Sequence, residues 1–303
     1  MRLMSAPRIV VVVVAFRPDL QRLHSMFLSL LPQVHDIVLV DNGSGEEVAN
    51  WVKGWTDGRV HGIYLGANTG IAFAQNRGIE LARSLGASHV LLMDHDSIPA
   101  PDMVAELYEA LQSSPQAAAV GPCYTDGRTS RKNRPFLRIS GLRMQRLGCA
   151  GSEPVLNVDH LISSGCLIPM HVLDRVGLMR EDFFIDMVDT EWCLRARSAG
   201  YQLYGVCQAK MEHALGDVPI SLFGREFITH SPWRHYFHVR NAILVYREPF
   251  VPLNWKLVSA RNLTLKMGFY VLISARRMQH LRHIWLGFRH GIAGRSGPFP
   301  SEE

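Results

Sequence analysis

Two aspartates close an apolar stretch, LLMDHDSIP, that runs from Leu91 to Pro99. Asp94 and Asp96 are separated by one histidine, and residues i and i+2 of an extended chain point to the same side. Two carboxylates this close repel each other unless a cation, a proton or a hydrogen-bond donor lies between them. The pair suits a hard divalent cation, Mg²⁺ or Mn²⁺, that bridges onward to phosphate oxygens. The alternative is a capping Asp94 beside a solvated Asp96.

A second group of acids lies in the segment FFIDMVDTEWCLRA, which contains Asp186, Asp189 and Glu191 just before and within an expected helix. A helix N-terminus stabilises a carboxylate in its charged form, so an acid there is a competent base. Simple N-capping is the alternative. Further along, His213 ends an expected strand, where it is either an additional metal ligand or a structural histidine.

Two earlier segments carry polar residues of the kind that bind nucleotides. Asp41 closes the apolar run DIVLVD and can accept hydrogen bonds from a ribose hydroxyl or a base N–H, or it can shape a turn. In NTGIAFAQNRG, Gly70 permits close approach, Asn68 can cap the helix that follows, and Asn76 lies two turns into that helix. Because the chain has no GK[ST] element and no GxGxxG, neither of those phosphate-binding loops is predicted.

Alternating strands and helices must position these residues. Such alternation predicts an α/β protein with right-handed crossovers and a mainly parallel sheet. In sheets of this kind, ligands bind beyond the carboxyl ends of the strands, where Asp41 and Asp94 both fall. Strands are expected at 9–16, 36–41, 60–65, 89–96, 118–122, 161–169 and 201–206, helices at 20–31, 46–55, 71–85, 101–112, 171–179 and 189–200, and a long loop or hairpin over the site at 124–158.

Composition limits the class of protein. The chain has 303 residues, of which 47% are hydrophobic and 19% are charged, so it can fold as one large domain or as one domain with an appendage. Its five cysteines are irregularly spaced and form no CxxC pair, which favours buried thiols in a reducing compartment. The apolar run at 9–16 is too short to span a bilayer and is followed by Arg17, Pro18 and Asp19 rather than a cleavage site. A cytoplasmic protein is therefore expected.

The net charge of +5 is concentrated near the C-terminus, because residues 249–301 contain no Asp or Glu. Basic residues there alternate with aromatic and aliphatic ones, which predicts an amphipathic segment lying in the interface of an anionic membrane. The alternative is a helical appendage whose basic face is simply solvated. No nucleic-acid-binding module is recognisable. We therefore expect a catalytic domain over residues 1–248 and a basic, helical, membrane-proximal segment over 249–303.

Taken together, the order and spacing of these stretches resemble glycosyltransferase family 2, the inverting enzymes with the GT-A nucleotide-diphospho-sugar fold. The resemblance extends from about Ile9 to Arg247. The matching stretches are V-D-N-G-S, N-x-G-x-A-x-A-x-N-x-G, D-x-D-S, S-S-G-C-L-I, F-F-I-D-x-V-D-T-E-x-C-L-R-A, x-E-H and R-x-Y-x-x-x-R-N. Within the family, D-H-D-S, I-S-S-G-C-L, F-I-D-x-V-D-T-E and S-P-x-R-x-Y-x-x-x-R-N are similar to bacterial rhamnosyltransferases that use dTDP-L-rhamnose.

The resemblance implies roles for the donor-binding residues. Asp41 would contact the nucleoside base or ribose, and Asn68, Gly70 and Asn76 would line the nucleotide-diphosphate pocket. Arg240, in the last stretch, would also contact the donor.

The resemblance also implies the metal ligands and the base. Asp94 and Asp96, with His213, would hold Mg²⁺ or Mn²⁺ against the diphosphate. Asp189 would be the catalytic base. The family usually has a glutamate directly before that aspartate, and this chain has Val188 there. The acids at positions 186 and 191 therefore remain competitors for the base role.

The function expected from the resemblance is metal-dependent, inverting transfer of L-rhamnose to a saccharide or lipid-linked acceptor in the synthesis of a surface polysaccharide or glycolipid. It would take place at the inner face of the cell membrane. Transfer from another dTDP- or UDP-sugar and a non-catalytic nucleotide-sugar-binding role are the alternatives. A nucleotidyltransferase would need a glycine-rich, basic loop after the first strand, and AFRPDL does not supply one.

Overall fold

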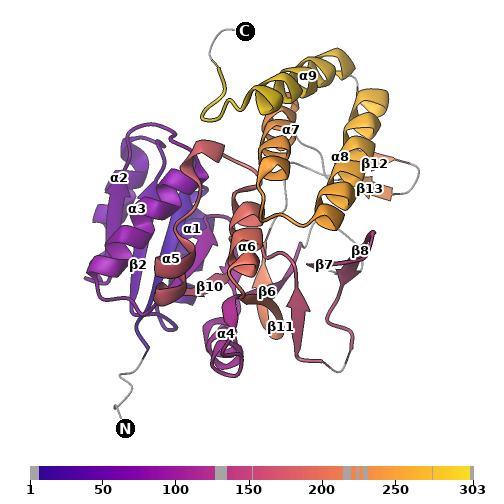
Figure 1. Ribbon diagram of the computed structural model, residues 1–303. Helices are drawn as coiled ribbons and strands as arrows, with labels where there is room; N and C mark the ends of the chain where they lie inside the picture. Colours follow the sequence, from indigo (N-terminus) through magenta and orange to yellow (C-terminus); the bar gives the residue numbers. More distant parts are fainter. Residues whose placement is uncertain are drawn as a thin grey trace.

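A computed structural model describes residues 7–126, 135–151, 153–213, 220–222, 225–227, 231–274 and 276–300. In this part of the chain a nine-stranded sheet is flanked by helices on both faces, and three further helices lie beyond one of its edges (Figure 1). The structure is thus a mixed α/β protein with C-terminal helices, as the sequence predicts.

The sheet has the strand order β3-β2-β1-β4-β10-β6-β11-β5, and β9 also pairs with β11. All the strands except β5, β9 and β10 run in the same direction, so the sheet is mostly parallel. The bounds of these strands are β1 Ile9–Ala15, β2 Asp36–Asp41, β3 Val60–Tyr64, β4 His89–Asp94, β5 Ile98–Pro99, β6 Ala117–Thr125, β9 Val155–Val158, β10 Cys166–Pro169 and β11 Gln202–Glu212. The antiparallel β10, between β4 and β6, is a feature that strand–helix alternation alone does not predict.

The central strand β1 shows why this sequence forms a sheet covered on both sides. All seven residues of IVVVVVA are buried, and β-branched side chains fit such a pleated, buried surface. Val10 and Val12 pack into one core cluster, whereas Val11 and Val13 pack into the other. The strand period of two thus divides one apolar run between the two helical layers.

The helices lie in two layers, one on each face of the sheet. On the face reached by Val11, α1, α2 and α4 bury their apolar sides, and on the opposite face α3, α5 and α6 do the same. Their bounds are α1 Leu20–Leu30, α2 Glu46–Lys53, α3 Ile71–Ser84, α4 Met103–Gln112, α5 Met170–Val176 and α6 Val188–Ser198. A 3₁₀ turn, η1, covers Glu181–Phe183 before α6.

The C-terminal helices are α7 (Pro232–Arg247), α8 (Leu253–Ile273) and α9 (Arg277–Ala293). α9 packs closely across α7, because Gly287 and Gly291 leave room for it. A Cβ atom on Gly287 would lie 2.5 Å from the carbonyl oxygen of Tyr236, and one on Gly291 would lie 2.8 Å from Ile243. Among the described residues, no helix is both long enough and apolar enough to cross a membrane. The division of the chain at residue 248 stays a prediction.

Two small hairpins complete the described structure. The segment expected to be a loop or hairpin contains β7 (Phe136–Ser140) paired with β8 (Arg143–Leu147), while 127–134 and 152 lie outside the described residues. A second hairpin pairs β12 (Ile220–Leu222) with β13 (Arg225–Phe227).

One expectation about cysteine is wrong. Cys149 and Cys207 form a disulfide, whereas Cys123, Cys166 and Cys193 are buried free thiols. The antiparallel pairing of β9 with β11 brings the two bonded residues together, with 5.3 Å between their Cα atoms. Because 58 positions separate them in sequence, their spacing alone does not reveal the pair.

Candidate active site

Three side chains at the carboxyl edge of the sheet form a cluster that could hold a metal ion. Asp94 is the last residue of β4, and Asp96 follows in the turn leading to β5. Pairing of β5 with the end of β11, Ile98 with Glu212, brings the next residue, His213, alongside them. His213 Nδ1 lies 3.3 Å from Asp96 Oδ1, and its Nε2 lies 4.0 Å from Asp94 Oδ2.

Two buried serines fix this turn. Ser97 Oγ lies 2.8 Å from His213 Nδ1 and 2.7 Å from Ser164 Oγ, and the Asp94 N–H donates to Ser164 Oγ at 3.1 Å. From α1, Arg22 Nε donates to the backbone carbonyl of Asp96 at 2.6 Å. The sequence assigns no role to these three supporting residues, although the serines fall within the D-H-D-S and S-S-G-C stretches.

The two carboxylates and the imidazole shift one another's pKa values. Burial raises the pKa of Asp94, the nearby charge of Asp96 raises it further, and His213 opposes both. For Asp96, burial raises the pKa, but the hydrogen bond with His213 and the charges of His213 and His95 together outweigh it, so the pKa lies below the ordinary value. The pKa of His213 is raised, because the hydrogen bond to Asp96 and the charge of Asp94 outweigh its own burial. The site thus concentrates negative charge, and the three groups influence one another's protonation.

These three residues fit a divalent cation. One possible ligand atom from each lies within 4.8 Å of the others, and this is the only such cluster among the described residues. Two ligands on opposite sides of one Mg²⁺ are about 4.2 Å apart, so small side-chain rotations would complete the coordination. Two carboxylate oxygens and one imidazole nitrogen are a donor set that Mn²⁺ and Mg²⁺ accept.

A second part of the site is Asp189, in the first turn of α6. Its Oδ1 accepts a hydrogen bond from the N–H of Thr190 at 2.7 Å, and its Oδ2 lies 3.4 Å from His160 Nε2. The side chain is 29% exposed and therefore reachable. Its charge contributes to the raised pKa of Asp94, so the two carboxylates are within electrostatic range of each other.

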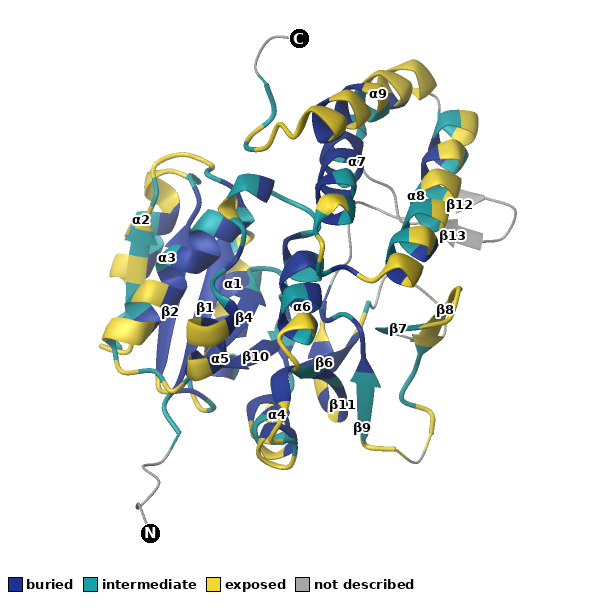
Figure 2. Cartoon of the chain, in the orientation of Figure 1, coloured by how far each residue is buried: buried dark blue, intermediate teal, exposed yellow. Residues whose placement is uncertain are grey.

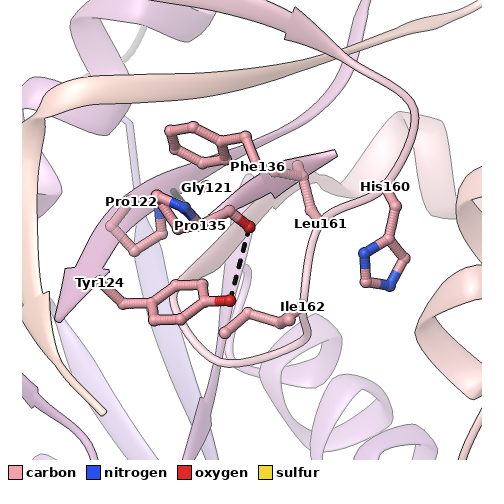
Figure 3. A pocket seen from close by; sticks show the side chains of 8 residues that line it. All are labelled: Gly121, Pro122, Tyr124, Pro135, Phe136, His160, Leu161 and Ile162. Atoms are coloured by element: carbon pink, nitrogen blue, oxygen red, sulfur yellow. Dashed lines mark hydrogen bonds between the residues drawn. The ribbon is translucent and has the colours of Figure 1, made fainter. Parts of the chain in front are cut away.

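His160 also lines a small pocket beside Asp189 (Figure 3). The ring of Tyr124 and the side chain of Phe136 form other parts of its wall, and the Tyr124 hydroxyl donates to the Pro135 carbonyl at 3.4 Å. His160 was not singled out from the sequence, since a single histidine in a loop carries no spacing signal.

The two acids that compete with Asp189 are occupied by ion pairs. Asp186 lies 3.1 Å from Arg234 and 3.4 Å from His238. Glu191 is 1% exposed and accepts two hydrogen bonds from Arg195. The geometry therefore favours Asp189 over both of them as a group that can exchange protons with a bound molecule.

The segment directly before α6 has unusual backbone geometry, and α7 holds it. Phe184, Asp186 and Met187 all have positive φ, between 63° and 65°, which L-residues other than glycine rarely adopt. Asn241 Nδ2 lies within 2.7–3.0 Å of three carbonyl oxygens there, those of Phe183, Ile185 and Asp186.

Arg240 is the neighbour of Asn241 on α7 and also contacts the turn before α6. It is fully buried and donates to the carbonyls of Phe183 and Gly297. A guanidinium enclosed in this way supports the turn before α6. Its expected contact with the donor stays a prediction.

The residues expected around the nucleotide have different surroundings in the structure. Asp41 is 3% exposed and accepts from the N–H of Ser44 with both carboxylate oxygens, so it shapes the turn after β2. Asn68 is exposed and accepts from the N–H of Gly70 and from Asn42 Nδ2. Asn68 lies two positions before Gly70, which is the N-cap residue of α3.

Gly70 and Asn76 are used for packing. A Cβ atom on Gly70 would lie 2.6 Å from the carbonyl oxygen of Phe184, so the close approach that glycine permits is to the turn before α6. Asn76 is 2% exposed and bonds to the backbone of Met179 and to Glu181. Its amide is satisfied within the protein, and its expected place in the diphosphate pocket stays a prediction.

Comparison with known proteins identifies the family. The model of glycosyl transferase family 2 matches residues 10–175. The chain is 33% identical over 295 residues to a dTDP-rhamnosyl transferase, RfbF, of Shigella flexneri, covering 94% of this chain and 96% of that protein. The chain belongs to glycosyl transferase family 2. As a family 2 glycosyltransferase, it is an enzyme, and the metal-ligand cluster and Asp189 lie in the part of the chain that RfbF matches.

More distant relatives and solved structures support the fold. A low-salt glycan biosynthesis hexosyltransferase, Agl10, of Haloferax volcanii is 24% identical over 293 residues, covering 92% of this chain and 88% of that one. The structure of S. aureus TarS with UDP-GlcNAc matches with a TM-score of 0.61 and 12% identity over 94% of this chain and 81% of TarS. GalNAc-T7 with UDP, GalNAc and Mn²⁺ matches with a TM-score of 0.58 and 13% identity over 96% of this chain and 56% of that one. These likenesses confirm the predicted GT-A-like fold.

Proposed function

We propose that this glycosyltransferase transfers L-rhamnose from dTDP-L-rhamnose, with inversion, to a saccharide or lipid-linked acceptor. The observation that carries the proposal is the convergence of Asp94, Asp96 and His213 on one edge of the sheet, with Asp189 within electrostatic range. The donor sugar is taken from the similarity to RfbF, which extends over 94% of this chain. Other dTDP- or UDP-sugars are the alternative donors.

In this mechanism Asp189 takes the proton from an acceptor hydroxyl while that oxygen attacks the anomeric carbon of the donor. The bond between the anomeric carbon and the diphosphate oxygen breaks as the new bond forms, and the nucleoside diphosphate leaves with the electron pair. A single displacement of this kind inverts the configuration. The ion pairs of Asp186 and Glu191 leave Asp189 as the acid best placed for this proton transfer.

Asp94, Asp96 and His213 would hold Mg²⁺ or Mn²⁺. The bound ion would supply positive charge for the diphosphate as it departs. Ser97 and Ser164 orient the ligands, since their hydroxyls contact each other, His213 Nδ1 and the N–H of Asp94.

We further propose that the acceptor belongs to a cell-surface polysaccharide or glycolipid and that the enzyme works at the inner face of the cell membrane. Support for this location comes from the C-terminal region, whose 249–300 segment has basic and apolar residues and no acid.

The test is the release of nucleoside diphosphate from a panel of nucleotide sugars by the purified full chain, with Mg²⁺, Mn²⁺ or EDTA. We expect metal-dependent turnover of dTDP-L-rhamnose that is lost in Asp94→Ala and kept in the surface variant Asp57→Ala. Turnover of a different sugar would discard the rhamnosyl assignment and keep the mechanism. If calorimetry detects no binding of any nucleoside diphosphate, the chain is not a functional transferase.

A further inference from the structure

Helix α9 carries an apolar stripe on its outer side. Met278, Leu281, Trp285, Phe288 and Ile292 follow one another at alternating steps of three and four residues, which places them along one face of a helix. Between 44% and 69% of each side chain is exposed. The Trp285 and Phe288 rings stack with 5.7 Å between their centroids, so the stripe is a continuous apolar surface.

This stripe is separate from the face that α9 uses for packing. The buried residues of the helix are His280, Leu286, Gly287, His290 and Gly291, and Tyr236 and Ile243 of α7 contact this side. Figure 2 shows α9 at the edge of the molecule, with exposed residues along its outer side and α7 buried beneath it. Within the described chain the outer stripe is therefore left uncovered.

The end of α8 carries a further exposed apolar side chain. Leu272 is 82% exposed in the last turn of α8, and only a short connection separates it from Met278. Contiguous exposed apolar surface of this kind marks an interaction site rather than ordinary solvent exposure.

Arginines lie on both sides of the stripe. At the helical advance of about 100° per residue, Arg282 and Arg289 fall on one flank and Arg277 on the other. All three are exposed, and no Asp or Glu is present between residues 249 and 300. An apolar stripe between basic flanks is typical of a helix lying in the interface of a membrane that contains anionic lipid.

We propose that the α9 face, made of these five apolar residues and three arginines, binds the surface of an anionic lipid bilayer. A second copy of the chain fits this face poorly, because pairing two such stripes would bring arginine flanks of like charge together without a facing acid. Lipid phosphates supply the opposite charge, and the acyl region accepts Trp285 and Phe288.

The role of this face in catalysis rests on the proposed function. α9 packs on α7, and Arg234 of α7 pairs with Asp186, three residues before the proposed base. Helix α7 thus contacts both α9 and the turn directly before α6. A lipid-linked acceptor held in the bilayer would be presented near that turn.

The experiment is co-sedimentation of the full chain with vesicles of phosphatidylcholine, with and without phosphatidylglycerol. We expect binding to the anionic vesicles that falls at least about tenfold in Trp285→Ser/Phe288→Ser, since two large apolar side chains are lost. Arg277→Gln/Arg289→Gln should weaken binding to anionic vesicles by about 25-fold, at about fivefold for each charge. Leu28→Ser, which changes an equally exposed leucine on α1, is the control and should bind like the wild type.

Two results would overturn the proposal. One is a wild-type chain that stays in solution with anionic vesicles. The other is a dimer in sedimentation velocity that Trp285→Ser/Phe288→Ser dissociates, because the face would then bind a second copy. Nucleotide-sugar hydrolysis without vesicles should be unchanged in the same variant, so loss of catalysis and loss of lipid binding are separate readouts. Vesicle binding by a chain that turns over no donor would refute the proposed function and leave the α9 face in place.

Discussion

The imidazole of His160 lies 3.4 Å from the carboxylate of Asp189, and the two come from different elements. Asp189 is in the first turn of α6, whereas His160 follows β9 and forms an isolated bridge with Leu137. The carboxylate is thus held from two sides, by the N–H of Thr190 on one oxygen and by the imidazole beside the other. This arrangement aims one carboxylate oxygen and leaves the group accessible.

If Asp189 is the base, Asp189→Asn should reduce kcat by about 10²–10⁴-fold, because the amide cannot accept a proton. Donor binding should persist, since the proposed ligands for the diphosphate-bound ion are other residues. Steady-state kinetics test the expected loss of kcat, and calorimetry with dTDP tests the expected persistence of donor binding. If Glu191→Gln loses activity to this extent while Asp189→Asn keeps full activity, the base is Glu191 and not Asp189.

His160 is expected to position Asp189. His160→Ala should lower kcat by about 10- to 100-fold with little change in the KM for donor, because misplacing a reacting group is costly. His160→Gln keeps an N–H donor near the position of Nε2 and should recover part of the loss. If His160→Ala and His160→Gln have equal activities, or if only the KM changes, the imidazole does not orient the base.

The metal cluster can be tested without turnover. Mn²⁺ bound to the full chain should give a calorimetric or paramagnetic signal that EDTA removes. Asp96→Asn should weaken binding by at least about tenfold, because each protein ligand contributes to affinity and the remaining charge is reduced. Asp102→Asn, an exposed acid at the start of α4, is the matched control. Unchanged Mn²⁺ affinity in Asp96→Asn would remove it from the ligand set.

The turn before α6 should depend on Asn241. Its amide donates to three carbonyls of a segment in which three residues have positive φ. Asn241→Asp preserves the shape but removes these donors, and should lower the free energy of unfolding by about 2–3 kcal/mol and reduce kcat. Asn254→Asp, which removes one exposed contact with Gly141, is the control for denaturant unfolding. Equal stability in the two variants would contradict a supporting role.

Much of this fold follows from local sequence signals. The runs that form β1, β2 and β4 are rich in β-branched and aliphatic residues, and they end where turns begin, so these strands could be predicted. Because parallel strands share a carboxyl edge, the place of Asp94 was also predictable. The x-E-H stretch pointed to His213, and its pairing through β5 and β11 confirms that it lies beside the aspartates.

Long-range contacts explain what the sequence could not reveal. His160 reaches Asp189 only through the pairing of β9 with β11, and nothing in its neighbourhood marks it. Arg240 shows a different limit, because a motif names a residue without saying whether it contacts the ligand or the turn beside it. Its burial and its hydrogen bonds to the carbonyls of Phe183 and Gly297 show that it supports the turn, while its contact with the donor stays a prediction.

Acid should destabilise the packing of α7 against α8 and α9. Burial, helped by the nearby His280 and His238, lowers the pKa of His235 to about 3, and burial lowers that of His238 to about 4. The unfolded chain takes up these protons near pH 6.5, whereas the folded chain resists them until the pH is much lower. The unfolded state therefore binds more protons in this window, and the free energy of unfolding should fall as the pH drops below 6.5.

For His235 alone the loss amounts to about 2 kcal/mol at pH 5. Calorimetric Tm values between pH 8 and pH 5 should therefore decline, and the decline should be shallower in His235→Phe, which removes the buried imidazole. His24→Gln, which changes an exposed histidine on α1, should follow the wild-type slope. Parallel slopes for wild type and His235→Phe would mean that the acid sensitivity arises elsewhere in the molecule.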